Sequence, residues 1–213
     1  MSLDTYLLFL PACFALNMAF GPNNVLSLSN RARIGVLHSV TAALGRLAAF
    51  AIMIAITGLG LGALLLASET LFIVLKFGGA AYLVWLGIRL LRSKPTEQAL
   101  VVTERAGRRD RAGLLLTHCR QEFYVAAGNP KAILIFTAFF PQFVDRTHYA
   151  LSFTVLGAIF LVLELVAITI YALIGARLRF LIMNPKGFVW LNRISGSLMV
   201  GFGSLLALMR RPA

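Results

Sequence analysis

Long apolar runs are the feature that most restricts how this chain can fold. Several of them reach or exceed the ~20 residues with which an α-helix crosses the ~30 Å hydrocarbon layer of a bilayer. The sequence lacks the ten-residue segments of alternating apolar and polar residues that are typical of a membrane barrel. Hydrophobic residues make up 59% of the chain and charged residues only 13%. These features predict an all-α integral membrane protein.

Hydropathy predicts a bundle of six transmembrane helices. Three spans fall in a first half, residues 1–92, and three in a second half, residues 114–213, with a basic linker over 93–113 between them. A duplicated unit with an odd number of spans must insert its second copy upside down, as in many secondary transporters. We therefore expect two inverted three-helix repeats. The predicted spans are 5–29, 36–66, 70–91, 114–140, 149–176 and 187–208.

The basic residues predict the orientation in the membrane. Most lysines and arginines outside the spans lie after the first, third and fifth spans, and only Arg146, Arg210 and Arg211 lie on the opposite side. By the positive-inside rule the linker is cytoplasmic and both termini are outside. This role also accounts for much of the net charge of +12, so nucleic acid is not an expected partner. Residues 1–4 lack a basic segment, which argues against a cleaved signal peptide.

Two of the apolar runs are interrupted by glycine, proline and amide residues. Proline inside a helix removes a backbone hydrogen bond and costs about 3 kcal/mol, and in lipid the freed carbonyls need other partners. A helix that restarts after such a break points unpaired N–H groups and a positive dipole end into the core, which suits a carboxylate. A plain proline kink without a ligand is the alternative. The expected substrate-binding residues are Gly21, Pro22, Asn23 and Asn24 in the first break, and Gly128, Asn129, Pro130 and Lys131 in the second.

The fourth span has a polar opening, His118 to Glu122, so its membrane-embedded part is expected to begin near Phe123. Four charged residues are expected at membrane depth: Arg46, Lys76, Lys131 and Glu164. Each costs about 2.5–3.5 kcal/mol at the bilayer centre, so we expect them to face the bundle interior, form pairs or extend to the interface. Arg46 and Glu164 could form an interior ion pair. Alternatively, Glu164 carries a proton while Arg46 or Lys131 binds the substrate carboxylate. Three cations against one acid predict an anionic group, such as a carboxylate, as the guest.

No cofactor and no metal site is expected. Cys13 and Cys119 offer neither a disulfide framework nor a metal-ligand pair, and the three histidines are scattered. A metal-ion exporter would need clustered ligands in the spans, and a membrane-embedded enzyme acting on lipid or phosphate would need a catalytic pair at membrane depth. A small accessory subunit would leave the buried charges unexplained. The sequence therefore favours a transporter over an enzyme and leaves a homo-oligomer open.

Several stretches resemble the LysE/RhtB family of amino-acid exporters, over nearly the whole chain. The matching stretches are Gly21-Pro22-Asn23-Asn24, residues 76–87 (Lys76-Phe77-Gly78-Gly79 through Trp85-Leu86-Gly87), Asn129-Pro130-Lys131-Ala132 with Pro141-Gln142-Phe143, and Asn192-Arg193-Ile194-Ser195-Gly196. The resemblance implies a bacterial inner-membrane exporter of amino acids or related small metabolites, driven by the proton gradient or the membrane potential. By position it also implies that Pro22, Asn23, Asn24, Asn129, Pro130 and Lys131 line the translocation region.

The sequence departs from this family at two positions. Phe20 stands where many members have a proline, which predicts a softer first break. Arg46 stands after Gly45, where an acid is common, which favours neutral or acidic substrates over a cationic one such as lysine.

Overall fold

The computed structural model describes residues 3–67, 69–92, 111–145, 147–183 and 185–208, and this part of the chain is helical without strands. A π-helical turn, Ile135–Phe139, and a 3₁₀ turn, Phe140–Gln142, follow α7. The α-helices are α1 (Leu3–Met18), α2 (Pro22–Ile34), α3 (Val36–Ala42), α4 (Leu44–Ala67), α5 (Glu69–Leu91), α6 (Arg111–Ala127), α7 (Pro130–Leu134), α8 (Tyr149–Met183) and α9 (Pro185–Leu208).

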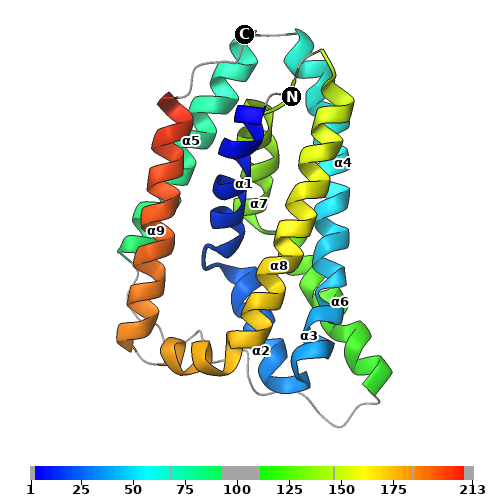
Figure 1. Cartoon of the computed structure of the whole chain (residues 1–213), viewed down its shortest axis with the longest axis vertical. Helices are drawn as coiled ribbons and strands as arrows, with labels where there is room; N and C mark the ends of the chain where they lie inside the picture. Colours follow the sequence, from blue (N-terminus) through cyan, green and yellow to red (C-terminus); the bar gives the residue numbers. More distant parts are fainter. Residues whose placement is uncertain (1–2, 68, 93–110, 146, 184, 209–213) are drawn as a thin grey trace.

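The helices form an elongated bundle (Figure 1). We call the end where α1 begins and α9 ends the upper end, and the end where α2 ends and α6 begins the lower end. The chain descends through α1 and α2 and ascends through α6 and α7, so these two helix pairs run in opposite directions. Each pair is broken about midway between the two ends. Opposite directions are what an inverted repeat requires, although the repeat itself remains a prediction.

Two helical segments of the described chain, Val36–Gly60 and Tyr149–Leu173, are long and apolar enough to cross a membrane, and there are four candidates if each bent pair is one span. These four correspond to the first, second, fourth and fifth predicted spans. α5 and α9 occupy the ranges of the third and sixth, where spanning remains a prediction. Residues 93–110 of the linker lie outside the described part, as do both chain ends.

The first break is the sharper of the two. α1 and α2 are bent by 60°, and the segments on either side of the second break by 52°, so Phe20 does not make the first break softer than the second. α1 already ends at Met18, and the fully extended Gly21 separates it from Pro22, which starts α2. Because Gly21 and Pro22 make the turn together, a proline at position 20 is not needed.

α5 and α9 lie side by side at one edge of the bundle and pack with their backbones in contact (Figure 1). A Cβ atom built on Gly87 would lie 2.7 Å from the Gly196 carbonyl oxygen, and one on Gly196 would lie 2.6 Å from that of Gly87. Only glycine allows this approach, which is typical of packing between membrane helices.

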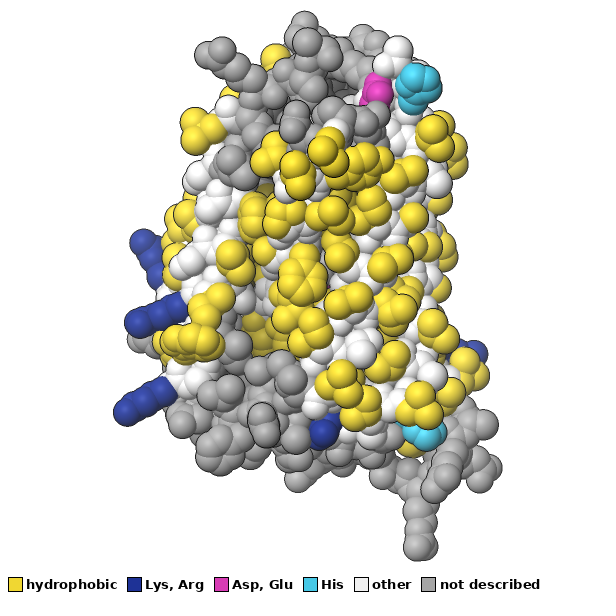
Figure 2. Space-filling view, in the orientation of Figure 1, with side chains coloured by type: hydrophobic (Ala, Val, Ile, Leu, Met, Phe, Trp, Pro, Cys, Tyr) yellow, Lys and Arg dark blue, Asp and Glu magenta, His cyan; other side chains and the backbone are white. Residues whose placement is uncertain are grey.

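The described surface is mainly apolar. Figure 2 shows hydrophobic side chains over most of this face, with lysine and arginine in its lower half. Leucines, isoleucines and tryptophans such as Leu59 and Trp190 are exposed, whereas Arg46 and Glu122 are fully buried. An apolar exterior around buried charges fits a lipid environment.

Candidate functional site

The carbonyls that end α1 are satisfied by side chains from other helices. A helix leaves its last carbonyls without intrahelical partners, and in lipid each needs a donor. Here the donors come from α2, α7 and α8: Lys131 Nζ to Leu16 O (3.0 Å) and Ala19 O (3.1 Å), Asn24 Nδ2 to Asn17 O (2.9 Å) and Ala19 O (3.0 Å), and Tyr171 Oη to Met18 O (2.8 Å). The first break therefore depends on tertiary contacts.

The second break is satisfied locally. Asn129 is the N-cap of α7, and its Oδ1 accepts a hydrogen bond from the Lys131 backbone N–H at 3.0 Å. On the other side of the break, the Gly128 N–H donates to the Tyr124 carbonyl at 3.0 Å. By contrast, no side chain caps the start of α2. Only the first break thus leaves its helix start without a side-chain acceptor.

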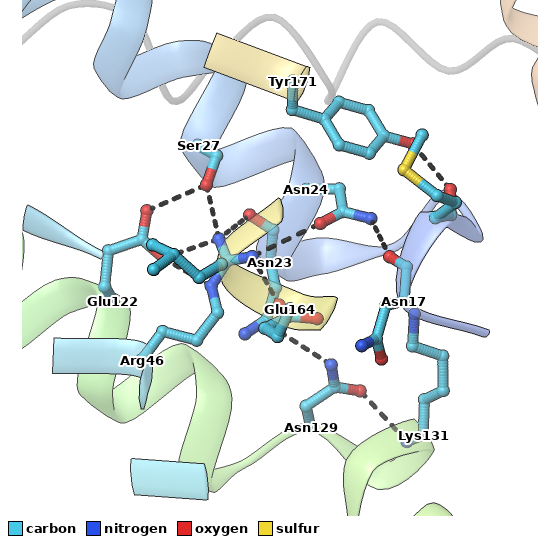
Figure 3. Close-up of polar contacts among 12 residues, drawn as sticks. Asn17, Asn23, Asn24, Ser27, Arg46, Glu122, Asn129, Lys131, Glu164 and Tyr171 are labelled. Carbon is cyan, nitrogen blue, oxygen red and sulfur yellow. Dashed lines mark hydrogen bonds and ion pairs between the residues drawn. The ribbon is translucent and has the colours of Figure 1, made fainter. Parts of the chain in front are cut away.

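One hydrogen bond joins the two breaks directly. Asn129 Nδ2 donates to Asn23 Oδ1 at 2.7 Å (Figure 3). Because Asn129 Oδ1 already accepts from Lys131, its amide must point its NH₂ at Asn23, and this fixes both amide orientations. Asn23 Nδ2 is left as the buried side-chain polar atom without a hydrogen-bond partner among the described residues. Asn23, which follows Pro22, and Asn129, which precedes Pro130, therefore meet in the core, and Asn23 Nδ2 remains free to donate a hydrogen bond.

Arg46 is the centre of a buried polar network (Figure 3). An arginine has five N–H donors, and acceptors on α2, α6 and α8 engage all of them. The ion pair with Glu164, one of the two alternatives that the sequence left open, is present, whereas the pair with Glu122 was not predicted. The acceptors are Glu122 Oε2 (2.7 Å from Nη2 and 3.0 Å from Nε), Glu164 Oε1 (3.0 Å), Asn24 Oδ1 (3.3 Å), Ser27 Oγ (2.6 Å) and Asn23 O.

Glu122 corrects the expected charge balance. With Glu122 and Glu164 against Arg46 and the part-buried Lys131, the core holds two acids and two cations among the described side chains, so an excess of cations is no longer a reason to expect an anionic group. The Lys76 side chain lies outside the described ones. Glu122 is not among the charges predicted at membrane depth, because it lies in the polar opening of the fourth predicted span. Its four-residue spacing from His118 and Ala126, which are also buried, is the signal that identifies an inward helix face.

A small cavity lies between the breaks. Its free volume is about 10 Å³, which is close to the space that one water molecule needs. Lys131 and Glu164 give it opposite charges, amides give it polar walls, and aromatic rings give it an apolar wall. The lining residues are Asn17, Asn23, Asn24, Phe50, Asn129, Lys131, Ala132, Ile135, Phe160 and Glu164.

The structure gathers some of the predicted site residues and not others. Asn23, Asn24, Asn129, Lys131 and Glu164 all line the cavity. Pro22, Gly128 and Pro130 are exposed, and Gly21 is half-buried, so these residues shape the breaks without lining the cavity. Arg46 lies behind the lining, and a contact with a substrate would require that Glu122 or Glu164 release it. The predicted site residues did not include the lining residues Asn17, Phe50, Ala132, Ile135 and Phe160.

The cavity is closed in different ways toward the two ends. Toward the upper end lies a phenylalanine cluster whose rings contact one another at centroid distances of 4.8–5.8 Å. Toward the lower end lies the Arg46 network. The phenylalanine cluster consists of Phe9, Phe50, Phe136, Phe139, Phe140, Phe143, Phe153 and Phe160.

The sequence of this chain is similar to one protein family and to several individual proteins, among them the following three. The family described as LysE type translocator matches residues 14–210. The chain is 34% identical to an uncharacterized membrane protein of Vibrio cholerae over 97% of this chain and 98% of the relative. It is 30% identical to a homoserine/homoserine lactone efflux protein of Salmonella typhimurium over 99% of both chains, and 30% identical to a leucine efflux protein of Salmonella choleraesuis over 89% and 88%. No solved structure matches the chain.

Proposed function

Because this chain belongs to the LysE type translocator family, we propose that it exports amino acids or closely related metabolites across the bacterial inner membrane. The substrate binds between the two helix breaks. The observation that carries this proposal is the hydrogen bond between Asn23 and Asn129 beside a cavity that contains both Lys131 and Glu164. It makes one site out of two distant segments.

The chemistry of the cavity suits a zwitterion. A substrate carboxylate would accept from the Lys131 ammonium and from Asn23 Nδ2, and a substrate ammonium would bind the Glu164 carboxylate. Phe50, Ile135 and Phe160 offer an apolar wall to the substrate side chain. Since the buried charges cancel, a substrate of zero net charge fits better than an anion. The two efflux relatives are named for homoserine and leucine, and both amino acids are neutral.

The closed cavity supports an alternating-access mechanism. Its free volume of about 10 Å³ is too small for an amino acid, so the helices must separate before a substrate enters. We assign loading to the lower end, which the basic residues make cytoplasmic, and release to the upper end. Glu164 is our candidate for proton coupling, because protonation would break its ion pair with Arg46. The membrane potential is the alternative driving force.

Counterflow in liposomes tests the proposal. Purified protein is reconstituted with an imposed pH gradient and offered labelled homoserine, leucine, glutamate and lysine. We expect exchange of the neutral amino acids, with glutamate and lysine at background. Absence of exchange for a broad amino-acid panel would overturn the proposed function. Collapsing the pH gradient and the membrane potential separately identifies the driving force, and unchanged transport without a pH gradient would remove Glu164 from proton coupling.

Geometry gives no support to the metal-exporter alternative. Within the described ranges, no group of three or more histidine, cysteine, aspartate or glutamate residues is placed to hold a metal ion. A metal ion can be added to the same counterflow panel as a direct comparison.

A further inference from the structure

Glu122 is a fully buried carboxylate that does not line the cavity. We propose that Glu122, through its ion pair with Arg46, is the gate residue that closes the path from the cavity to the lower end. It is a positioning residue, because it acts on the substrate only through Arg46. This inference rests on the proposed export function for its biological meaning, but the gate can be tested without any transport measurement.

The position of the pair along the bundle supports a gate. α2 runs from the first break toward the lower end, and at 1.5 Å per residue Ser27 lies about 8 Å and Asn30 about 12 Å beyond Pro22. Both donate to Glu122 Oε1, at 3.5 and 2.9 Å. Glu122 in turn lies five residues before the end of α6, which is about 8 Å on the lower side of the second break. The ion pair therefore lies between the cavity and the lower end.

The contacts of this pair tie together the helices that surround the path. Arg46 comes from α4, Glu122 from α6 and Glu164 from α8, and Ser27 of α2 contacts both Arg46 and Glu122. One side chain thus links four helices at one level of the bundle. Separation of α2 from α6 at the lower end has to break the contacts of Glu122.

The two acids that bind Arg46 have different surroundings. Glu164 lines the cavity, so a substrate ammonium competes there with Arg46 for the same carboxylate. Glu122 is out of reach of the cavity and binds Arg46 through both Nε and Nη2. When the substrate occupies Glu164, Glu122 still holds Arg46 and keeps the lower path closed behind the loaded substrate. A single acid could not serve both purposes at once.

A thiol-labelling experiment tests the gate. The reporter is Ile135→Cys, which lines the cavity without joining the polar network, in a background with Cys13→Ala and Cys119→Ala. A membrane-impermeant thiol reagent is applied to oriented vesicles from one face at a time. We expect Glu122→Gln to accelerate labelling from the lower face tenfold or more, with less than a twofold change from the upper face.

Two further variants make the result decisive. Glu122→Asp keeps the charge but shortens the side chain, so we expect a smaller acceleration from the same face, and this variant decides the test if Glu122→Gln does not fold. Asp145→Asn removes a partly exposed acid near the upper end, outside the network, and should change neither rate. Unchanged labelling from the lower face, or equal acceleration from both faces, would overturn the gate.

Transport kinetics separate a gate from a structural role. Because Glu122 does not line the cavity, Glu122→Gln should lower the maximal counterflow rate at least fivefold while KM stays within twofold, and Glu122→Asp should recover part of the rate. A proportional loss of folded protein with an unchanged rate per folded molecule would contradict the gate. If the wild type exchanges no amino acid but labelling responds as expected, the proposed function fails and the gate stands. If the wild type exchanges amino acids but labelling does not respond to Glu122→Gln, the proposed function stands and the gate fails.

Discussion

The two helix breaks look alike in the sequence and differ in how their backbone groups are satisfied. At the second break, Asn129 caps α7 from within the break itself. At the first break, the carbonyls of α1 depend on side chains from three other helices, and α2 starts without a side-chain cap. The second break is therefore close to a self-sufficient turn, whereas the first exists only in the assembled bundle.

This difference shows that the breaks are not independent copies of one device. Lys131 belongs to the second break, but its ammonium binds Leu16 and Ala19 at the first. Asn129 likewise binds Asn23 across the core. A movement of the second break thus changes the hydrogen bonding of the first, which is a direct physical route for coupling two half-sites.

Lys131→Ala is expected to have the largest effect. It removes the ammonium that donates to the Leu16 and Ala19 carbonyls, and losing hydrogen bonds from a charged donor typically costs about 1.5–3 kcal/mol. It also removes the cation of the cavity. We predict loss of counterflow by about 100-fold, together with a lower melting temperature. Arg120→Ala, which removes an exposed cation from α6, is the control and should leave both quantities unchanged. Full activity of Lys131→Ala would show that the first break does not need the second.

Phe20→Pro introduces the proline that the family resemblance led us to expect. The Phe20 N–H donates to Ser195 Oγ at 2.7 Å, and the ring of Phe20 is buried. Proline lacks the N–H, and the loss of a buried phenylalanine side chain alone typically costs about 3 kcal/mol. We predict a clear drop in the free energy of unfolding. Ser195→Ala, which removes only the acceptor, should cost about 1 kcal/mol. A stable Phe20→Pro variant would mean that the first break does not need the tertiary contacts of Phe20.

Asn129→Ala should cost about 1–2 kcal/mol, because it removes both the N-cap of α7 and the hydrogen bond to Asn23. Asn129→Asp keeps the cap acceptor, replaces the donor to Asn23 by a second acceptor oxygen and adds a negative charge next to Lys131. We therefore expect Asn129→Asp to retain most of the stability but to lose transport, as measured by chemical unfolding and counterflow on the same preparations. Equal stability losses in the two variants would show that the cap contributes little to the second break.

Tyr171→Phe is the mildest change. It removes the hydroxyl that donates to the Met18 carbonyl and leaves the ring in place, so we predict a loss of about 1 kcal/mol in stability with counterflow nearly intact. Tyr124→Phe on the exposed face of α6 is the matched control. A large loss of transport in Tyr171→Phe would show that the donors from Lys131 and Asn24 do not hold the first break without the Tyr171 hydroxyl.

Part of this arrangement could be predicted from the sequence. Proline and amide residues in apolar runs indicated both breaks, and the cost of isolated charges in lipid made an ion pair of Arg46 and Glu164 one of two alternatives. Glu122 was missed because it lies near the start of a span, where solvation is the ordinary expectation. The acceptors of Lys131 were beyond prediction, since backbone carbonyls leave no signature in the sequence. The size of the cavity depends on how the helices approach one another, which hydropathy does not record.

Substrate protection tests the central claim, that one amino-acid site lies between the two breaks. Thiol labelling of Ile135→Cys is measured in vesicles that carry out counterflow, with and without a saturating concentration of the transported amino acid. We predict that the substrate slows labelling at least fivefold, while a non-transported amino acid has no effect. Unchanged labelling in vesicles that transport the same substrate would contradict a site between Asn23 and Asn129.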